Sequence, residues 1–171
     1  MSSQLAGMVL SELRRRAETV ATAESLTGGL LGGLLTEVSG ASDSYVGGVI
    51  SYATRLKVTL AGVDRATLQA VGPVAERTAT EMASGVCRRC QADWGLATTG
   101  VAGPNPQDGH PVGEVFVAVA HPASGLFRVE ALSLFGDRAR IRSAAAAHAV
   151  RLLAEALDIA VDTDPRVSEE P

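Results

Sequence analysis

The chain has 171 residues, a net charge of −4, 46% hydrophobic residues and only 4% aromatic residues. This length and apolar content predict a single domain with a sizeable core. The weak negative charge and the scarcity of aromatic rings argue against a nucleic-acid-binding surface. No run approaches the ~20 apolar residues that span a bilayer, so we expect no membrane partner. Charges follow the apolar residues at the N-terminus, the reverse of a signal peptide, which favours a cytoplasmic protein.

Hydrophobic spacing and turn residues predict an α/β fold in which helices and strands alternate. Helical patterns cover residues 5–16, 30–38, 54–60, 64–68, 74–90 and a last segment that starts at 136. Predicted strands cover residues 19–22, 45–52, 93–99, 114–120 and 127–135. We expect a three-layer α/β/α single domain over residues 1–161, with a mixed, partly parallel sheet closed by a hairpin of the last two strands. The polar stretch 162–171 is predicted to be a disordered tail.

Ser25 lies at a predicted junction between a short strand and a glycine-rich apolar helix, within Val20–Leu30. The start of a helix exposes unpaired N–H groups and a partial positive charge. A serine at such a bend lies beside donors that could hold an oxyanion or a phosphate. The alternative is that Ser25 or Thr27 only caps the helix, which is what such residues usually do.

Lys57 is the only lysine among the 15 Lys and Arg residues of the chain. Arginine stays protonated in proteins, whereas a lysine amine can be neutralised by burial or by a neighbouring cation. Ser25 and Lys57 follow two predicted strands, so the two residues would meet at one sheet edge if those strands are parallel neighbours. A Ser/Lys hydrolytic dyad is one reading. An ordinary surface cation at position 57 is the other, and the composition does not decide between them.

Other patterns exclude several classes of site. The chain has neither a G-x-S-x-G elbow nor a nucleotide-binding glycine motif. Cys87 and Cys90 fall in a helical pattern and are predicted to be structural thiols, so we expect no metal and no redox role. His148 is predicted to lie in the core, and His110 and His121 to be solvated. The loop Thr98–Pro106 follows a buried strand and could bind a ligand, although a plain surface connection is the commoner case.

Four motifs resemble, in order and spacing, those of the CinA C-terminal domain family. They are Thr22–Gly29 (TAESLTGG), Ser51–Lys57 (SYATRLK), Thr99–Pro104 (TGVAGP) and Gly136–Arg138 (GDR). The likeness spans about Leu5 to Leu157, without the N-terminal domain that full-length CinA proteins add. The sequence therefore resembles the stand-alone enzymes of this family, the nicotinamide-nucleotide amidohydrolases of the PncC type.

This resemblance implies hydrolysis of the carboxamide of nicotinamide mononucleotide to the acid and ammonia, without a cofactor. Ser25 matches the family's nucleophile and Lys57 its general base. Thr99 matches a small hydroxyl residue beside the site, and Tyr52 the tyrosine that precedes the lysine. The sequence departs from the family pattern at Leu26, where cysteine is common, and at Ala53–Thr54, where Ser-Asn is usual. A homodimer is expected at the family level.

The hypothesised mechanism requires a neutral Lys57 and an oxyanion held by N–H groups near the start of the helix. Arg138 or the loop Gly100–Gly103 would bind the phosphate, although Arg138 could equally serve as a surface or helix-end charge. Glu24 could orient a hydroxyl, but favouring the helix start is the better-supported reading. The residues expected to bind substrate are Leu26, Thr27, Gly28, Gly29, Gly100, Ala102, Gly103 and Arg138.

Two other functions fit the same sequence. One is a non-catalytic module that binds a nucleotide or takes part in competence-associated interactions. The other is an amidase of the same mechanism that acts on a different small amide.

Overall fold

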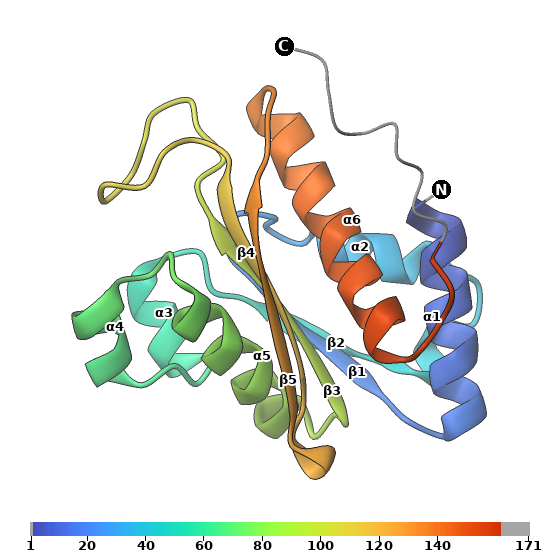
Figure 1. The fold of residues 1–171 in the computed structure, drawn as a ribbon. Helices are drawn as coiled ribbons and strands as arrows, with labels where there is room; N and C mark the ends of the chain where they lie inside the picture. Colours follow the sequence, from blue (N-terminus) through green and yellow to red (C-terminus); the bar gives the residue numbers. More distant parts are fainter. Residues whose placement is uncertain (1, 162–171) are drawn as a thin grey trace.

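The computed structural model describes residues 2–161 and contains one five-stranded sheet with helices on both faces (Figure 1). The strand order is β2-β1-β3-β4-β5. β1 pairs in parallel with β2 and with β3, whereas β4 is antiparallel to both β3 and β5. The strands are β1 (Val20–Glu24), β2 (Tyr45–Ile50), β3 (Trp94–Gly100), β4 (Glu114–His121) and β5 (Leu126–Ser133). The expected three-layer α/β class, with a partly parallel sheet closed by a hairpin, is confirmed. The predicted tail 162–171 lies outside the described residues.

The helices divide between the two faces of the sheet. Figure 1 shows α1, α2 and α6 on one side of the edge-on sheet and α3, α4 and α5 on the other. The first group is α1 (Ser2–Arg16), α2 (Leu30–Thr36) and α6 (Arg138–Ala156). The second is α3 (Thr54–Thr59), α4 (Arg65–Val71) and α5 (Glu76–Cys90). Two short 3₁₀ turns, Ala41–Asp43 and Pro122–Ser124, complete the described chain. None of the helices within residues 2–161 combines the length and apolarity that crossing a membrane requires.

The two faces of the sheet are filled by side chains of different size. The face under α1, α2 and α6 buries large residues such as Trp94, Leu96 and Val117. The face under α5 buries mostly alanines, which lets this helix approach the sheet closely. At Gly95 a Cβ atom would lie 2.0 Å from the Ala83 carbonyl oxygen of α5. The small residues of the α5 face are therefore required by the short distance between helix and sheet.

The three parallel strands bring their carboxyl ends to one edge of the sheet. Glu24, the last residue of β1, pairs with Ile50 of β2 and with Thr98 of β3. Beyond this point the Ser51 N–H donates to the Glu24 carbonyl at 2.8 Å, and the Ser25 N–H donates to the Thr98 carbonyl at 3.0 Å. The residue after β1 and the residue after β2 are thus held side by side, as the sequence predicted for parallel neighbours.

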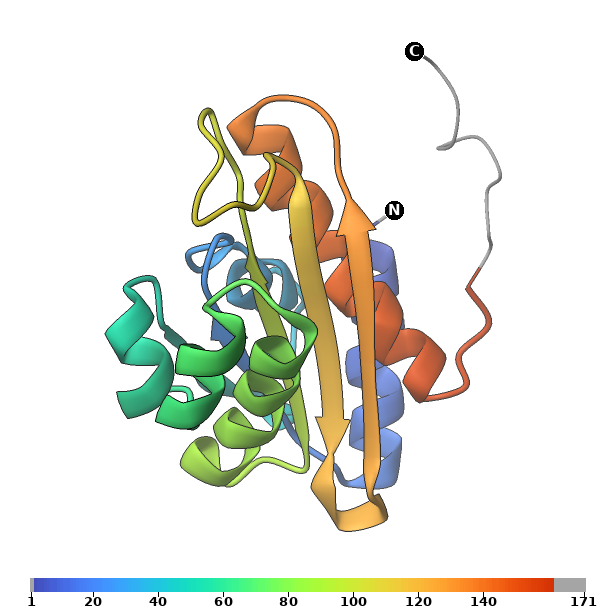
Figure 2. The ribbon, with the colours of Figure 1, turned by 60° about the vertical axis from the view of Figure 1, so that its left-hand side comes forward.

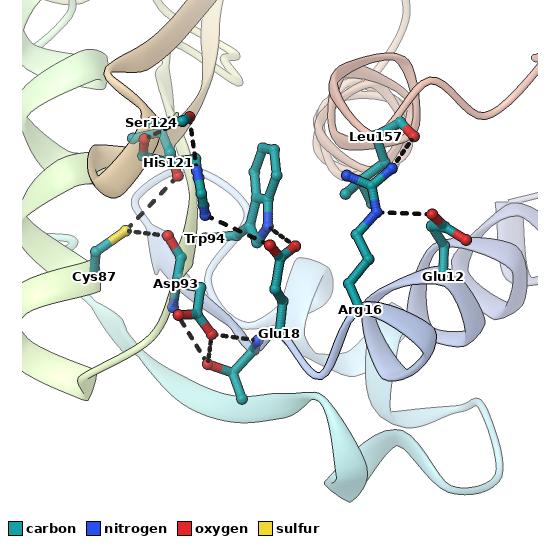
Figure 3. A network of polar contacts seen from close by, with 11 residues as sticks. Glu12, Arg16, Glu18, Cys87, Asp93, Trp94, His121, Ser124 and Leu157 are labelled. Carbon is teal, nitrogen blue, oxygen red and sulfur yellow. Dashed lines mark hydrogen bonds and ion pairs between the residues drawn. The ribbon is translucent and has the colours of Figure 1, made fainter.

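The opposite end of the sheet is closed by a network of polar contacts (Figure 3). The Trp94 indole N–H donates to Glu18 at 2.8 Å, and the ring of His121 stacks on Trp94 with centroids 4.5 Å apart. The His121 side chain is only 14% exposed, so the prediction that this histidine is solvated was wrong. Its position at the end of a strand predicted exposure, but the tryptophan on the neighbouring strand covers it. His110 is half-buried against Glu114, and His148 is half-buried rather than in the core.

Gly32 and Gly33 of α2 show why neighbouring helical glycines need not share a role. Because a glycine inside a helix costs stability, each of the two would be expected to allow close packing. A Cβ at Gly32 would lie 2.6 Å from the Tyr45 hydroxyl oxygen, which itself hydrogen bonds Thr22. A Cβ at Gly33 would meet nothing within 4 Å, so the expectation is wrong for Gly33, which faces solvent.

We expect Gly33→Ala to raise the free energy of unfolding by about 0.5–1 kcal/mol, because alanine loses less backbone entropy in a helix. Gly32→Ala should lower it by about 1–3 kcal/mol, because its methyl group would force the Tyr45 ring to move. Urea denaturation of both variants measures the two effects. Equal shifts for the two would contradict the packing assigned to Gly32.

Candidate active site

The site is built around a direct contact between Lys57 and Ser25. The Lys57 ammonium donates to Ser25 Oγ at 2.8 Å and to the Ser51 carbonyl oxygen at 3.2 Å. Ser25 directly follows β1, and Lys57 lies on α3, the short helix that follows β2. The Val63 N–H also donates to the Lys57 carbonyl at 2.9 Å, which fixes the end of this helix. The sequence-predicted pair is therefore brought together at the carboxyl edge of the sheet.

Lys57 is buried without a charge partner. Only 2% of the residue is exposed, and within residues 2–161 no carboxylate lies within 4.0 Å of its amine. Burial penalises the charged form, so the pKa of Lys57 falls from 10.5 to about 8. Because no anion counteracts the desolvation, a substantial fraction of the amine is neutral near physiological pH. A neutral amine can accept a proton from the serine hydroxyl that it contacts.

The segment after Ser25 is a turn rather than the first turn of a helix. Gly28 and Gly29 adopt positive φ values of 57° and 102°, and α2 begins only at Leu30. The prediction that Ser25 lies directly at a helix start is therefore wrong by about five residues. The strand-to-helix pattern itself is correct. The helix starts later because two consecutive glycines adopt left-handed conformations, and a glycine pair in the sequence does not reveal its φ values.

Glu24 occupies the N–H groups at the start of α2. Its buried carboxylate accepts from the amides of Gly29 at 2.8 Å, Leu31 at 3.1 Å and Gly32 at 2.8 Å. This supports the reading that Glu24 favours the helix start, and within residues 2–161 its carboxylate forms no hydrogen bond with a hydroxyl group. The donors of this helix start are consequently unavailable to an external anion.

The free amides lie at other positions. In the described part of the chain, no hydrogen bond is donated by the amides of Leu26, Ala102 or Gly103, and all three residues border the cavity. The Gly28 N–H instead donates to the Ser25 carbonyl at 3.1 Å. Buried amides are nearly always paired, so unpaired amides beside a cavity indicate donors kept for a ligand. Leu26 follows the serine directly and is the donor nearest to it in sequence.

A cavity of about 120 Å³ opens beside the Ser25–Lys57 pair. Its walls come from the residues after β1, β2 and β3, from the segment before α5 and from the start of α6. The lining residues are Ser25, Leu26, Tyr52, Thr54, Lys57, Pro73, Val74, Thr99, Gly100, Val101, Ala102, Gly103, Asn105, Gln107 and Arg138. In Figure 2 the long loop after β3 and the start of α6 lie at the same end of the sheet. The loop predicted to hold a ligand therefore borders the cavity.

Three predicted substrate-binding residues do not line this cavity: Thr27, Gly28 and Gly29. Thr27 is fully buried, and its hydroxyl hydrogen bonds Thr98 at 2.8 Å. The two glycines lie on the far limb of the turn, with Gly29 bound to Glu24. These residues were predicted to bind substrate because they follow Ser25 closely in the sequence, but the turn after Ser25 keeps them out of the cavity wall.

Arg138 connects two walls of the cavity. Its guanidinium donates to the Gly103 carbonyl at 2.7 Å and to the Tyr52 hydroxyl at 2.8 Å. It remains exposed, so one face of the cation is open to solvent. Thr99 is held differently, because its hydroxyl donates to the Pro73 carbonyl at 2.7 Å. Arg138 thus keeps an exposed cation at the cavity wall, whereas the Thr99 hydroxyl is bound within the wall.

Sequence reasoning missed Thr54, Pro73, Val74 and Gln107 in the cavity wall, and Arg142 behind it. Arg142 of α6 donates from Nε to the Leu26 carbonyl at 2.9 Å and from Nη2 to the Thr27 carbonyl at 2.8 Å. Nothing in the sequence separated it from the neighbouring arginines. Pro73 follows a glycine, a pattern that predicts a turn and gives no indication of a ligand site.

Metal-ligating side chains do not gather anywhere in residues 2–161: no group of three or more His, Cys, Asp or Glu residues is arranged to hold an ion. Cys87 is buried on α5, and burial raises the pKa of its thiol to about 11. A thiol of this kind is largely protonated and unreactive at neutral pH.

Comparison with known proteins places this architecture. The family model of the CinA C-terminal domain matches residues 2–157. The chain belongs to the CinA C-terminal domain family. A CinA-like protein of Frankia casuarinae is 50% identical over 149 residues, which cover 87% of this chain and 34% of the relative. The chain thus spans about a third of the length of the curated relatives that it matches.

Solved structures of this CinA family share the fold across nearly their whole length. The competence/damage inducible protein CihA from Agrobacterium tumefaciens is 34% identical with a TM-score of 0.85, covering 92% of this chain and 95% of that one. A CinA superfamily protein from Klebsiella pneumoniae is 29% identical with a TM-score of 0.87, covering 92% and 98% of the two chains.

The buried amine is expected to cost stability in a pH-dependent way. Unfolded lysine has a pKa near ~10.4, so between about pH 8 and that value the unfolded state binds more protons. The free energy of unfolding should therefore rise with pH across this window. Below the window the full cost of burying the charged amine applies. We expect Lys57→Met to be more stable than the parent at pH 7 by about 1–3 kcal/mol, after allowing for lost hydrogen bonds.

Urea denaturation of both proteins at pH 7 and pH 10 measures this difference. The advantage of the variant should shrink at the higher pH, because the amine of the folded parent is neutral there and the unfolded state has begun to lose its proton. A difference that does not change with pH would show that Lys57 is not desolvated.

Proposed function

We propose that this chain hydrolyses the carboxamide of nicotinamide mononucleotide to nicotinic acid mononucleotide and ammonia. The observation that carries this proposal is the 2.8 Å contact between the buried Lys57 amine and Ser25 Oγ at the wall of a cavity. A hydroxyl beside a desolvated, unpaired amine is the arrangement that Ser/Lys nucleophilic catalysis requires. Membership of the CinA C-terminal domain family supports the choice of substrate.

The first half of the reaction forms an acyl-enzyme. Neutral Lys57 removes the Ser25 hydroxyl proton while Oγ attacks the amide carbon, and the carbonyl π electrons move to oxygen. The Leu26 N–H is free to hold this oxyanion, and the free amides of Ala102 and Gly103 lie in the same cavity wall. Protonated Lys57 then donates its proton to the amide nitrogen. The C–N bond breaks and ammonia leaves.

The second half returns the enzyme to its starting state. Lys57, neutral again, removes a proton from water, and the hydroxide attacks the acyl carbon. The ester bond to Ser25 breaks, and Lys57 returns the proton to the serine oxygen. One water is consumed for each acid and ammonia produced. A single group that gains and loses a proton twice in each cycle suffices, because its pKa of about 8 lies close to neutral pH.

The charge of the cavity supports an anionic substrate. None of its lining residues is an aspartate or glutamate, and Arg138 is the one permanent cation among them. The exposed face of Arg138 could pair with a phosphate, while the unpaired amides of Ala102 and Gly103 add neutral donors. The substrate phosphate would then lie toward the open side and the carboxamide toward Ser25.

A second function is favoured by the names of the structural relatives, which are described as competence or damage inducible proteins. Under this alternative the domain would bind a nucleotide or a protein without turning it over. The cavity would still be present, and only the chemistry would be absent.

The decisive variants are Ser25→Ala and Lys57→Arg. We expect both to lower ammonia release from nicotinamide mononucleotide by at least about 10³-fold, because each removes a group on which the covalent step depends. Arginine keeps the positive charge but stays protonated, so it cannot act as the base. Thermal unfolding of each variant checks that the fold is retained.

Assaying the parent protein against nicotinamide mononucleotide, nicotinamide riboside and nicotinamide separates the alternatives. Release from the nucleotide alone supports the proposed substrate, whereas comparable release from all three indicates an amidase of broader range. Ammonia release that persists in Lys57→Arg would eliminate the lysine as base. Tight binding without any release would support the non-catalytic module.

The pH dependence should follow Lys57. The base must be neutral in the free enzyme, so kcat/KM should rise about tenfold per pH unit below the lysine pKa and level off above about 8. Initial rates of ammonia release between pH 6 and pH 10 measure this profile. A flat profile across the range would contradict a lysine base with this pKa.

A further inference from the structure

Arg142 joins the last helix of the fold to the turn that follows the nucleophile. It lies on α6, 117 positions after Ser25 in the chain, and is partly buried. Its guanidinium contacts two successive carbonyl groups, from Nε to Leu26 at 2.9 Å and from Nη2 to Thr27 at 2.8 Å. The planar fork of arginine can bridge two acceptors at once, whereas a lysine ammonium is a point donor.

The contact to Thr27 extends to the peptide of the nucleophile. In a trans peptide the C=O and the N–H lie in the peptide plane and point in opposite directions, one to each side of the C–N bond. Arg142 holds the Thr27 carbonyl, so the Gly28 N–H of the same peptide points away from Arg142, and it donates to the Ser25 carbonyl at 3.1 Å. The Ser25 carbonyl and the Leu26 N–H belong to one peptide group, so holding this carbonyl inside the turn points the Leu26 N–H away from the turn. Two peptide planes thus connect the guanidinium with the unpaired Leu26 amide at the cavity wall.

Glu24 holds the same turn from its other end. Its carboxylate binds the amides of Gly29, Leu31 and Gly32, while Arg142 binds the carbonyls of Leu26 and Thr27. The Glu24 carboxylate accepts hydrogen bonds from N–H groups and the Arg142 guanidinium donates to C=O groups, so the two side chains do not compete for the same backbone groups. The left-handed glycines between them could otherwise adopt several conformations.

We propose that Arg142 is a positioning residue that sets the Leu26 N–H as an oxyanion donor beside Ser25. This inference rests on the proposed Ser/Lys hydrolysis. Arg142 does not line the cavity, so it acts through the turn and not on the substrate. Its removal should therefore impair the chemical step and leave substrate binding nearly intact.

The test compares Arg142→Gln and Arg142→Lys with Arg140→Gln, a matched control on the same helix whose side chain is exposed. With nicotinamide mononucleotide, we expect kcat to fall about 100-fold in Arg142→Gln, the typical effect of losing one oxyanion donor, and KM to change less than about threefold. Arg142→Lys should keep less than a tenth of the parent kcat, because lysine restores the positive charge but not the planar guanidinium that donates to two carbonyls at once. Arg140→Gln should match the parent.

A second readout works whether or not the nucleotide is the substrate. A fluorophosphonate probe forms a P–O bond with Ser25 Oγ, fluoride leaves, and Lys57 takes the serine proton, while the phosphoryl oxygen needs the same donor. Labelling of Ser25 should slow about 100-fold in Arg142→Gln and stay unchanged in Arg140→Gln. Thermal unfolding midpoints check that the variants remain folded at the assay temperature.

The outcomes separate the two proposals. A parent that labels at Ser25 but does not release ammonia overturns the proposed substrate, and the labelling rates then decide the role of Arg142. Parent-like rates in Arg142→Gln or in Arg142→Lys overturn the positioning role. A rise in KM with unchanged kcat also overturns it, because it would assign Arg142 to substrate binding. A parent inert in both assays overturns both proposals.

Discussion

The removal of one amine from water is the constraint on which this structure depends. Lys57 makes two hydrogen bonds, to a serine hydroxyl and a backbone carbonyl, and neither offsets the loss of a hydration shell as a carboxylate would. The surrounding strands and helices must therefore supply the stability that this residue withdraws. The same desolvation gives the amine a pKa of about 8, which the proposed role as a base requires. The stability cost and this proposed role have a single physical origin.

The desolvated Lys57 and the well-packed parts of the fold lie in different regions of the molecule. The two cores lie between the sheet and its helices, and the far end of the sheet is closed by Glu18, Trp94 and His121 (Figure 3). At the carboxyl edge the buried residues include polar ones such as Ser25 and Lys57, and three residues next to the cavity keep unpaired amides. Stability is thus concentrated where no ligand is expected, in line with the general tendency of active sites to be locally unfavourable.

Periodicity and strand-end reasoning predicted most of the architecture, because the patterns for β1 to β5 and for the long helices are local. The pairing of Ser25 with Lys57 was also accessible, since it needs only two parallel neighbours. The conformation of the turn after Ser25 was not accessible. It depends on the φ values of Gly28 and Gly29 and on Glu24, which reaches forward to amides up to eight positions away.

Arg142 was inaccessible for a different reason. Its function depends on where α6 lies relative to a turn more than a hundred residues earlier, and no spacing rule spans that distance. His121 was mispredicted similarly, because the ring that covers it belongs to another strand. Local sequence therefore identified Ser25 and Lys57, whereas Arg142 and the covering of His121 depend on tertiary contacts.

The position of α6 also has a consequence for the order in which the site is completed during synthesis. Ser25 and Lys57 lie more than 80 residues before Arg138 and Arg142 in the chain, so they leave the ribosome earlier. β1 needs β3 beside it, and α1 and α2 need α6 to cover their apolar faces. A nascent chain therefore exposes Ser25 before Arg142 can bind the carbonyls of Leu26 and Thr27. Under the proposed function, a chain that stops before α6 is expected to release no ammonia from nicotinamide mononucleotide.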